Sequence, residues 1–226
     1  MTRSRPVVAI DGPVGAGKST VARRLAEALG FEYVNTGAMY RAVAFAARAA
    51  GIGDDDPEAE RKLDALLAAA RIDFSAGRIM LDGRDISAEI GSPEMSESAS
   101  RLSTLGVVRA RMRDLQRAAG ARGAVVMEGR DIGTAVFPDA EFKFFLDASA
   151  EVRAERRWRE LAARGVTITR EEVLAQLHER DRRDRGRELA PLKPASDAIV
   201  VDASRMNVEE VLTLMAQRVS ARGGAA

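Results

Sequence analysis

The chain of 226 residues contains no cysteine, which excludes disulfides and thiolate metal sites and favours a cytoplasmic protein. Its formal net charge is only +1, so the overall charge gives no reason to expect a nucleic-acid partner. No hydrophobic run is long enough for a signal peptide or a membrane span, so we expect no membrane partner either. Lysine is also scarce, with four among 35 basic residues, and one of the four, Lys18, follows a glycine-rich stretch.

Short apolar runs alternate with helical segments along most of the chain. Strands and helices in this order predict an α/β fold, with a five-stranded parallel sheet and helices on both faces. The apolar runs that predict buried strands lie at 7–10, 31–35, 124–128, 142–148 and 198–203.

One segment departs from this alternation. The stretch RIDFSAGRIMLDGRDIS, residues 71–87, has alternating apolar positions and turn residues at 75–77 and 82–83, which predicts a small antiparallel meander. Because the meander interrupts the series of strands and helices, we expect it to lie outside the main sheet as an insertion. The length of the chain suits a single domain, residues 1–226, that carries such an insertion.

The stretch AIDGPVGAGKST, residues 9–20, fits the pattern G-x-x-x-x-G-K-[ST] between a predicted strand and a predicted helix. Glycines allow backbone N–H groups to turn toward phosphate oxygens, and the helix N-terminus favours the same anion. Lys18 could then reach the β- and γ-phosphates of a nucleotide, and the hydroxyl of Ser19 could ligate Mg²⁺. The predicted ATP-binding residues are Gly12, Pro13, Val14, Gly15, Ala16, Gly17, Lys18, Ser19 and Thr20.

A phosphate loop alone does not determine the reaction. GTPases read their base with an Asn-Lys-x-Asp sequence, which this chain lacks. ATP-driven motors have an apolar strand that ends in Asp-Glu, and the nearest candidate, VVMEGRD at 125–131, differs from that pattern. Neither of these two classes is therefore favoured.

Three further stretches are more specific: NTGAMYR at 35–41, MEGRDIGTAVFPDA at 127–140 and ERDRRDRGRELAPL at 179–192. Together they resemble the nucleoside monophosphate kinases, and most closely the bacterial cytidylate kinase family. The resemblance implies a three-layer P-loop kinase fold and transfer of the γ-phosphoryl group of ATP to CMP, and to dCMP, giving CDP or dCDP and ADP. It also implies a monophosphate-binding insert at about 36–102, which contains the meander, and a helical lid at about 151–168.

The resemblance also assigns roles to polar residues. Arginine suits a phosphate site because its planar fork makes bidentate contacts. The pair Arg180 and Asp184, taken alone, could instead be a salt bridge on the surface of a helix, since the residues are four apart. The CMP-binding residues implied by resemblance are Arg41, Arg130, Arg187 and Thr36 at the phosphate, Asp131, Arg109 and Ser100 at the cytosine, and Arg180 and Asp184 at the ribose.

The arginine-rich segment at 151–167 resembles the mobile lid of this family. Its arginines could cover the phosphates of ATP, or they could form a solvated helix face balanced by nearby glutamates. We expect one lid arginine to act in catalysis and favour Arg153 and Arg157 over Arg156. The predicted catalytic residues are Lys18, Arg130, Arg187, Arg153 and Arg157.

Two other functions stay open at this point. One is a kinase of the same fold that uses UMP or AMP as the acceptor, and the other is a nucleotide-binding module without transfer activity. Asp131 could accept a hydrogen bond from the exocyclic amine of cytosine, a group that thymine lacks. A regulatory module would not need the second anion site that the downstream arginines indicate. The expected partners are ATP and CMP or dCMP, with Mg²⁺ as cofactor, and the chain is expected to be a monomer.

Overall fold

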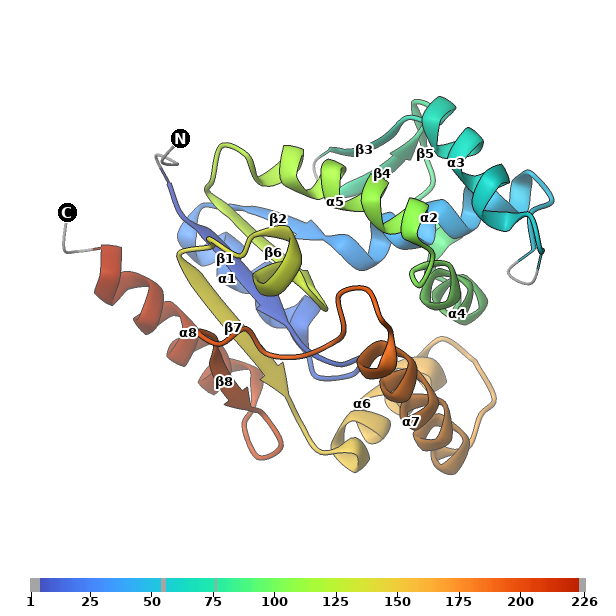
Figure 1. Ribbon diagram of the computed structural model, residues 1–226. Helices are drawn as coiled ribbons and strands as arrows, with labels where there is room; N and C mark the ends of the chain where they lie inside the picture. The colour runs from blue at the N-terminus through green and yellow to red at the C-terminus, as the bar shows by residue number, and fades with distance from the viewer. Residues whose placement is uncertain (1–4, 54–55, 76, 224–226) are drawn as a thin grey trace. The chain divides into compact units, whose positions relative to one another are not determined.

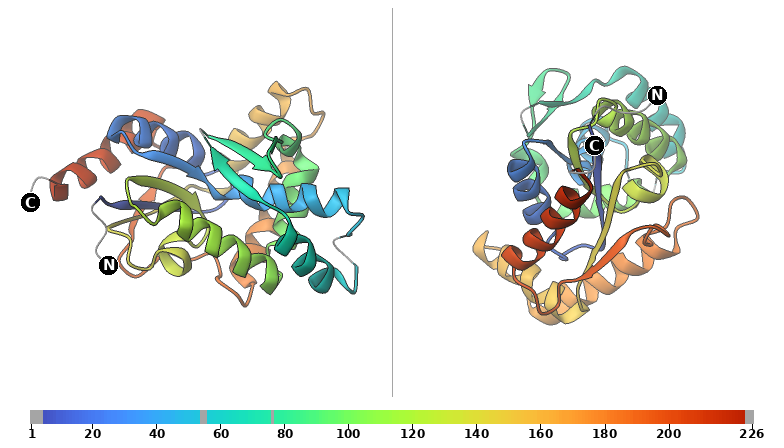
Figure 2. Two further views of the ribbon diagram at one scale, coloured as in Figure 1. Left: turned by 90° about the horizontal axis from the view of Figure 1, so that it is seen from above. Right: turned by 90° about the vertical axis from the view of Figure 1, so that its left-hand side faces the viewer.

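The structure, a computed structural model, describes residues 5–53, 56–75 and 77–223 (Figures 1 and 2). The chain divides into two compact units. The sheet unit comprises Met1–Tyr33 and Gly123–Ala226, and the inserted unit comprises Val34–Arg122.

A five-stranded sheet organises the sheet unit, with the strand order β2-β6-β1-β7-β8 (Figure 1). Pairing is parallel between β1 and β6, between β1 and β7, and between β7 and β8. The predicted α/β class and the five-stranded parallel sheet are confirmed. The strands are β1 Val7–Asp11, β2 Glu32–Asn35, β6 Val125–Gly129, β7 Phe142–Asp147 and β8 Ile199–Asp202.

The register of the central strands determines which loops leave the sheet together. Asp11, the last residue of β1, pairs with Gly129, the last residue of β6. The glycine-rich loop after β1 and the GRD segment after β6 therefore begin side by side at the carboxyl edge of the sheet, where α/β proteins bind ligands.

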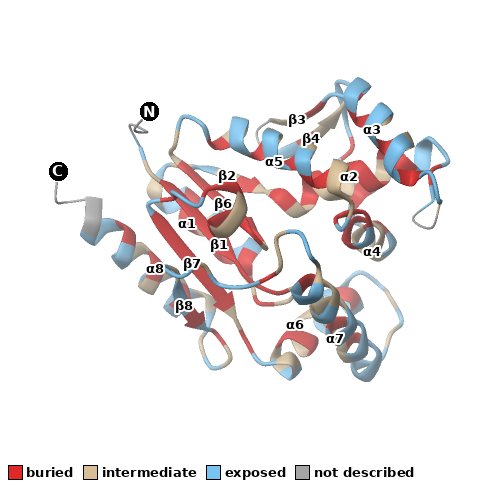
Figure 3. Cartoon of the chain, in the orientation of Figure 1, coloured by how far each residue is buried: buried red, intermediate tan, exposed pale blue. Residues whose placement is uncertain are grey.

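Helices α1 (Lys18–Leu29) and α8 (Val208–Gly223) pack on one face of this sheet. Leu25 of α1 and Met215 of α8 belong to the same buried cluster as Ile10 and Phe144, whose side chains point to that face. Burial along β1 and β7 is visible in Figure 3. A strand that is buried on both faces must be apolar at successive positions, and this explains the run VVAI at 7–10.

A pair of antiparallel helices follows β7 in the chain, α6 (Ala150–Ala163) and α7 (Arg170–Gly186), and they lie side by side in both views of Figure 2. Their contact has its own small core, which includes Leu161 and Leu177. Trp158 closes the connection, since its indole N–H donates to the carbonyl of Ile168 at 3.0 Å. Thr169 and Glu172 form a capping box that begins α7.

The inserted unit contains the predicted antiparallel meander, whose strands pair in the order β3-β4-β5. This unit continues beyond residue 102, because α5 packs against α3 and the N–H of Gly106 donates to Glu60 at 3.3 Å. Its elements are α2 Thr36–Ala49, α3 Ala59–Ala69, β3 Ile72–Ser75, β4 Arg78–Leu81, β5 Arg84–Asp85, the 3₁₀ turn η1 Glu89–Gly91, α4 Pro93–Leu102 and α5 Gly106–Gly120.

Helices long and apolar enough to cross a membrane do not occur in the described part of the chain.

Candidate active site

The glycine-rich loop joins β1 to α1 and passes close to the neighbouring strand β7 at Gly12, where only glycine fits. Gly12 has φ +148°, and a Cβ at this position would lie 1.9 Å from the carbonyl oxygen of Leu146. Gly17 caps α1 in a left-handed conformation with φ 97°. Backbone N–H groups at the start of α1 therefore face the space inside the loop, which is the arrangement that binds anions.

Lys18, the first residue of α1, is buried, and its ammonium group donates to the carbonyl of Pro13 in the same loop at 2.6 Å. Burial lowers the pKa of Lys18 well below its usual value, and the positive charge of Arg130 lowers it further. Glu128 and Asp11 oppose this effect. The loop thus holds a desolvated cation whose charge would be stabilised by a polyanion such as a nucleotide phosphate.

Ser19, Glu128 and Tyr33 form a hydrogen-bonded chain beside the loop. The hydroxyl of Ser19 donates to Oε2 of Glu128 at 2.9 Å, and the hydroxyl of Tyr33 donates to Oε1 of the same carboxylate. Burial and the neighbouring Glu128 raise the pKa of Tyr33, so its hydroxyl stays protonated and keeps donating. Arg23 lies over the ring of Tyr33, 5.5 Å from its centroid.

This chain of groups fits a Mg²⁺ ion that accompanies a nucleotide. The described residues include no cluster of three or more His, Cys, Asp or Glu side chains that could hold a metal ion by itself. Mg²⁺ does not require one, because it commonly uses one or two carboxylates together with water and phosphate oxygens. Because the hydroxyl of Ser19 donates its hydrogen bond to Glu128, the lone pairs of its oxygen remain available to the ion.

Asp11 links the glycine-rich loop to the segment that follows β6. Its carboxylate is buried and accepts hydrogen bonds from the backbone N–H groups of Ile132 at 2.8 Å and Gly133 at 2.7 Å. These two residues begin the short π-helix η2, Ile132–Val136. Single π-turns occur frequently at functional sites, and this one directly follows Arg130 and Asp131.

Three of the arginines predicted to bind the acceptor, Arg130, Arg180 and Arg187, surround one carboxylate, that of Asp184. Nε of Arg130 donates to Asp184 at 2.9 Å, and Nη1 of Arg187 lies 4.0 Å from the same carboxyl group. Arg187 also lies 3.7 Å from Asp131. Burial alone would raise the pKa of Asp184, but Arg130, Arg180 and Arg187 lower it. The sheet unit therefore brings these five predicted residues together, and Asp184 belongs to a buried network rather than to a surface pair with Arg180.

Arg153 on α6 is buried, in contrast to an arginine on a solvated helix face. Its Nη2 donates to Asp181 of α7 at 2.7 Å, its Nη1 donates to the carbonyl of Val14 at 3.2 Å, and its Nε donates to the carbonyl of Ala148 at 2.9 Å. The guanidinium group thus connects both helices of the pair to the glycine-rich loop.

The other two lid arginines differ in their surroundings. Arg156 donates to the carbonyl of Ala16 in the loop at 3.3 Å and to that of Ala203 at 2.8 Å. Arg157 pairs with Glu160 one turn along the same helix at 2.7 Å. Of the three, Arg153 and Arg156 contact the glycine-rich loop, and Arg157 makes a local ion pair.

The remaining predicted residues belong to the inserted unit. Thr36 is buried at the first position of α2, and a guanidinium nitrogen of Arg41 lies 3.4 Å from where a Cβ on the intervening glycine would stand. Ser100 and Arg109 are joined through Ser103, whose hydroxyl donates to the carbonyl of Ser100 at 2.8 Å and whose carbonyl accepts from Arg109 at 3.2 Å. This unit thus brings Ser100 and Arg109 together.

Three residues with clear places in this geometry were not predicted: Asp11, Tyr33 and Glu128. The sequence does contain a signal for Glu128, because this residue ends the apolar run at 124–128, but the run lacks the Asp-Glu pair of ATP-driven motors. Asp11 ends the first apolar strand in the same way. An acidic residue at the carboxyl end of a buried parallel strand is the feature common to both.

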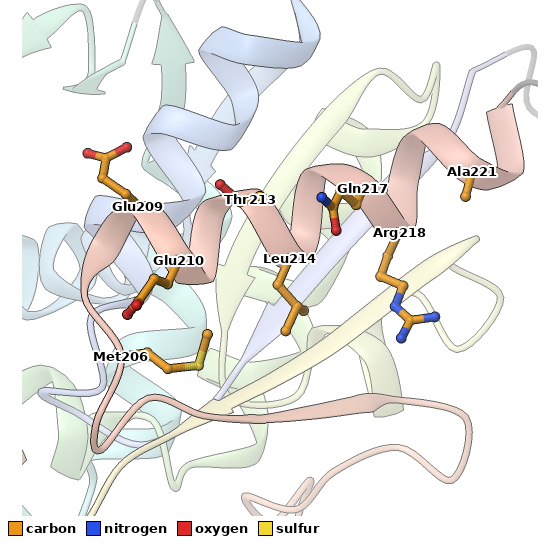
Figure 4. A pocket seen from close by; sticks show the side chains of 8 residues that line it. All are labelled: Met206, Glu209, Glu210, Thr213, Leu214, Gln217, Arg218 and Ala221. Carbon is orange, nitrogen blue, oxygen red and sulfur yellow. The ribbon is translucent and has the colours of Figure 1, made fainter.

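A hollow also runs along α8, lined by residues that include Met206, Leu214 and Arg218. Figure 4 shows Leu214 and Arg218 on the same side of the helix. None of the residues that line the hollow is a predicted site residue. The candidate active site is therefore the loop cluster at the carboxyl edge of the sheet, and not this hollow.

Comparison with known proteins shows the family to which this chain is similar. The family model described as cytidylate kinase matches residues 8–221. A cytidylate kinase of Geobacter sp. (strain M21) is 50% identical over 96% of this chain and 93% of its own length, and one of Pelotomaculum thermopropionicum is 49% identical over 96% and 97%. The solved structure of an uncharacterized protein from Eubacterium ventriosum shares the fold alone, with 12% identity, a TM-score of 0.51, and coverage of 96% of this chain and 100% of that chain. Because both the family model and these relatives match nearly the whole length, the chain belongs to the cytidylate kinase family.

Proposed function

We propose that the protein transfers the γ-phosphoryl group of ATP to CMP, and also to dCMP, giving ADP and the corresponding diphosphate. The observation that carries the proposal is that two cationic sites lie at the carboxyl edge of the sheet, one formed by Lys18 and the other by Arg130 and Arg187. Lys18 lies in a phosphate-binding loop, and Arg130 and Arg187 are held by Asp184 beside it. A kinase that uses a phosphate group as its acceptor must hold two polyanions close together, and one cationic site would serve each.

On the donor side, the glycine-rich loop and Lys18 would hold the β- and γ-phosphates of ATP, with Gly12 to Thr20 lining them. Mg²⁺, held through Ser19 beside Glu128 and otherwise by phosphate oxygens and water, would neutralise charge on the phosphates. Arg153, which donates to the loop carbonyl of Val14, would keep the loop and the helix pair α6–α7 together.

On the acceptor side, Arg130 and Arg187 would bind the phosphate of CMP. Asp184 keeps both guanidinium groups in place, and its lowered pKa means that it stays ionised at neutral pH. Groups that are already oriented lose little conformational freedom on binding and stabilise developing charge without rearrangement. Assigned by resemblance, the further CMP contacts are Thr36 and Arg41 at the phosphate, Asp131, Arg109 and Ser100 at the cytosine, and Arg180 and Asp184 at the ribose.

The transfer itself needs little from the protein beyond positioning and charge. An oxygen of the CMP phosphate bonds to the γ-phosphorus of ATP while the bond from that phosphorus to the bridging oxygen breaks, and ADP leaves. The acceptor phosphate is largely ionised at neutral pH, so no general base is required. Lys18, Arg130 and Arg187 would offset the charge that the two phosphates bring together.

Release of ADP tests this proposal. With ATP present, addition of CMP is expected to start ADP formation in the wild-type protein, and Lys18→Ala is expected to reduce the rate by several orders of magnitude while the protein stays folded. Binding of ATP without ADP formation in the presence of any nucleoside monophosphate would instead identify a nucleotide-binding module. Equal rates for wild type and Lys18→Ala would show that the site is placed wrongly.

A further inference from the structure

We propose that Asp11 is a positioning residue for the acceptor nucleotide, although it directly precedes the donor loop in the sequence. The inference rests on the proposed function, since it takes Arg130 and Asp131 to be CMP contacts. Asp11 would act through the backbone of the segment that carries them, without touching either nucleotide.

The hydrogen bonds of Asp11 point to the acceptor side. Its Oδ1 accepts from the N–H of Ile132 at 2.8 Å, and its Oδ2 accepts from the N–H of Gly133 at 2.7 Å. The first N–H groups of a helix have no partner within that helix, and Asp131, at the N-cap position of η2, makes no capping hydrogen bond with its side chain. Asp11, at the end of strand β1, supplies the missing acceptors for these two N–H groups.

Close packing shows that the segment fits tightly around this carboxylate. A Cβ on Gly133 would lie 3.5 Å from Oδ2 of Asp11 and 3.2 Å from Cδ of Lys143. Lys143 is itself fixed, because its ammonium group donates to the carbonyl of Pro138 and to Asp197. The start of η2 is therefore packed between Asp11 and the side chain of Lys143, and a side chain larger than that of glycine would have to displace Lys143 by a few tenths of an ångström.

The position of Ile132 determines the position of the two residues before it. Asp131 and Arg130 are connected to Ile132 by consecutive peptide bonds, and Arg130 reaches Asp184 through a single 2.9 Å hydrogen bond. If the start of η2 shifts, the guanidinium group of Arg130 and the carboxylate of Asp131 shift as well. A small displacement of such groups is costly, because oriented contacts depend on distances of a few tenths of an ångström.

The donor loop, in contrast, has hydrogen bonds that do not involve Asp11. Lys18 donates to the carbonyl of Pro13, Arg153 to that of Val14 and Arg156 to that of Ala16. Asp11 supplies no atom to these contacts, so removing its carboxylate deletes none of them. The charge of Asp11 also raises the pKa of Lys18, but burial, which Asp11→Asn leaves unchanged, has the larger effect on that pKa. Loss of that carboxylate should therefore weaken the binding of CMP much more than the binding of ATP, even though Asp11 is adjacent to Gly12 of the donor loop.

The test is Asp11→Asn, which keeps the shape of the side chain but offers one acceptor oxygen instead of two. Calorimetric titration of each nucleotide separately, together with the KM for each, is the measurement. We expect the CMP dissociation constant and KM to rise by about tenfold or more, as for loss of a hydrogen bond to a charged group, while the values for ATP stay within about twofold. Glu210→Gln is the matched control, because Glu210 also accepts a backbone N–H, that of Asn207 at 2.8 Å, but on α8. This variant should leave the dissociation constants and KM values of both nucleotides unchanged.

Equal weakening of CMP and ATP by Asp11→Asn, or no weakening of either, would overturn the inference. A wild-type protein that binds ATP but not CMP would overturn the proposed function instead, so the two failures can be told apart. If Asp11→Asn does not fold, Gly133→Ala decides, because its methyl group would lie 3.2 Å from Cδ of Lys143 and would press on the start of η2 where Asp11 holds it. That variant should show the same selective loss of CMP affinity, and an unselective loss would contradict the positioning role.

Discussion

Replacing Asp11 by asparagine is expected to change how the stability of the protein depends on pH. Burial raises the pKa of Asp11 from 3.8 to about 6, with the charge of Asp131 adding to the effect, while hydrogen bonds from Gly133 and Ile132 and the charge of Lys18 oppose it. In the unfolded chain the carboxyl group is in water and has its ordinary pKa. Between these two values the folded protein therefore binds a proton more strongly than the unfolded chain does.

The sign of the effect follows from proton linkage. Where the native state binds more protons than the unfolded state, the free energy of unfolding falls as pH rises. The shift of Asp11 from 3.8 to about 6 corresponds to about 3 kcal/mol, since each pKa unit is about 1.4 kcal/mol. This contribution to stability is present below the unfolded pKa and is lost as pH rises through the folded value. Asparagine does not ionise, so the variant lacks the dependence.

Urea denaturation of both proteins at a series of pH values from 4 to 7.5 measures the effect. The free energy of unfolding of Asp11→Asn minus that of wild type is expected to increase by about 2 to 3 kcal/mol across this range. Contributions from carboxyl groups that do not interact with Asp11 cancel in this difference. A constant difference for Asp11→Asn would show that the carboxyl group ionises as it does in water and would refute the linkage.

Three further predictions follow from single contacts. Gly12→Ala should destabilise the protein by about 3 kcal/mol or more, since its Cβ would lie 1.9 Å from a carbonyl oxygen. Gly30→Ala, where φ is positive but the space is open, should cost only about 1 to 2 kcal/mol. Thermal denaturation compares the two variants, and equal losses of stability would contradict the clash at Gly12. Tyr33→Phe should weaken Mg²⁺ binding to the ATP complex by about tenfold while metal-free ATP binding is unchanged, which Mn²⁺ titration by electron paramagnetic resonance can measure; unaltered metal binding would exclude an orienting role for the tyrosine. Arg130→Ala should raise the KM for CMP far more than that for ATP, and a larger effect on ATP would place this arginine on the donor side.

Much of the fold could be predicted because its signals are local. Strands β1 and β7 occur at the apolar runs because a strand buried on both faces needs apolar residues at successive positions. Helix α4 begins at Pro93 after Ser92, whose side chain accepts from the N–H of Met95, so proline and cap residue define that end. The glycine-rich loop was recognisable because its glycines are required at fixed positions.

Other features depend on contacts between residues far apart in the sequence, and no local pattern contains them. The π-helix at 132–136 is held by Asp11, which is 121 residues from Ile132. The burial of Arg153 depends on Asp181 of α7, and the spacing of arginines in one helix turn could not tell it from Arg157. Asp184 likewise was predicted at the ribose, but nothing in its own helix shows that Arg130 donates to it.

The most direct test of the central claim is a competition among acceptors. Wild-type protein, ATP and Mg²⁺ are incubated with equal amounts of CMP, dCMP, UMP, AMP and dTMP, and the diphosphate products are separated by chromatography at early times. We expect CDP and dCDP to form first, because Asp131, Arg109 and Ser100 are assigned to the cytosine. If labelled AMP is converted to ADP, or dTMP to dTDP, faster than CMP is converted to CDP, the claim that CMP is the preferred acceptor is contradicted.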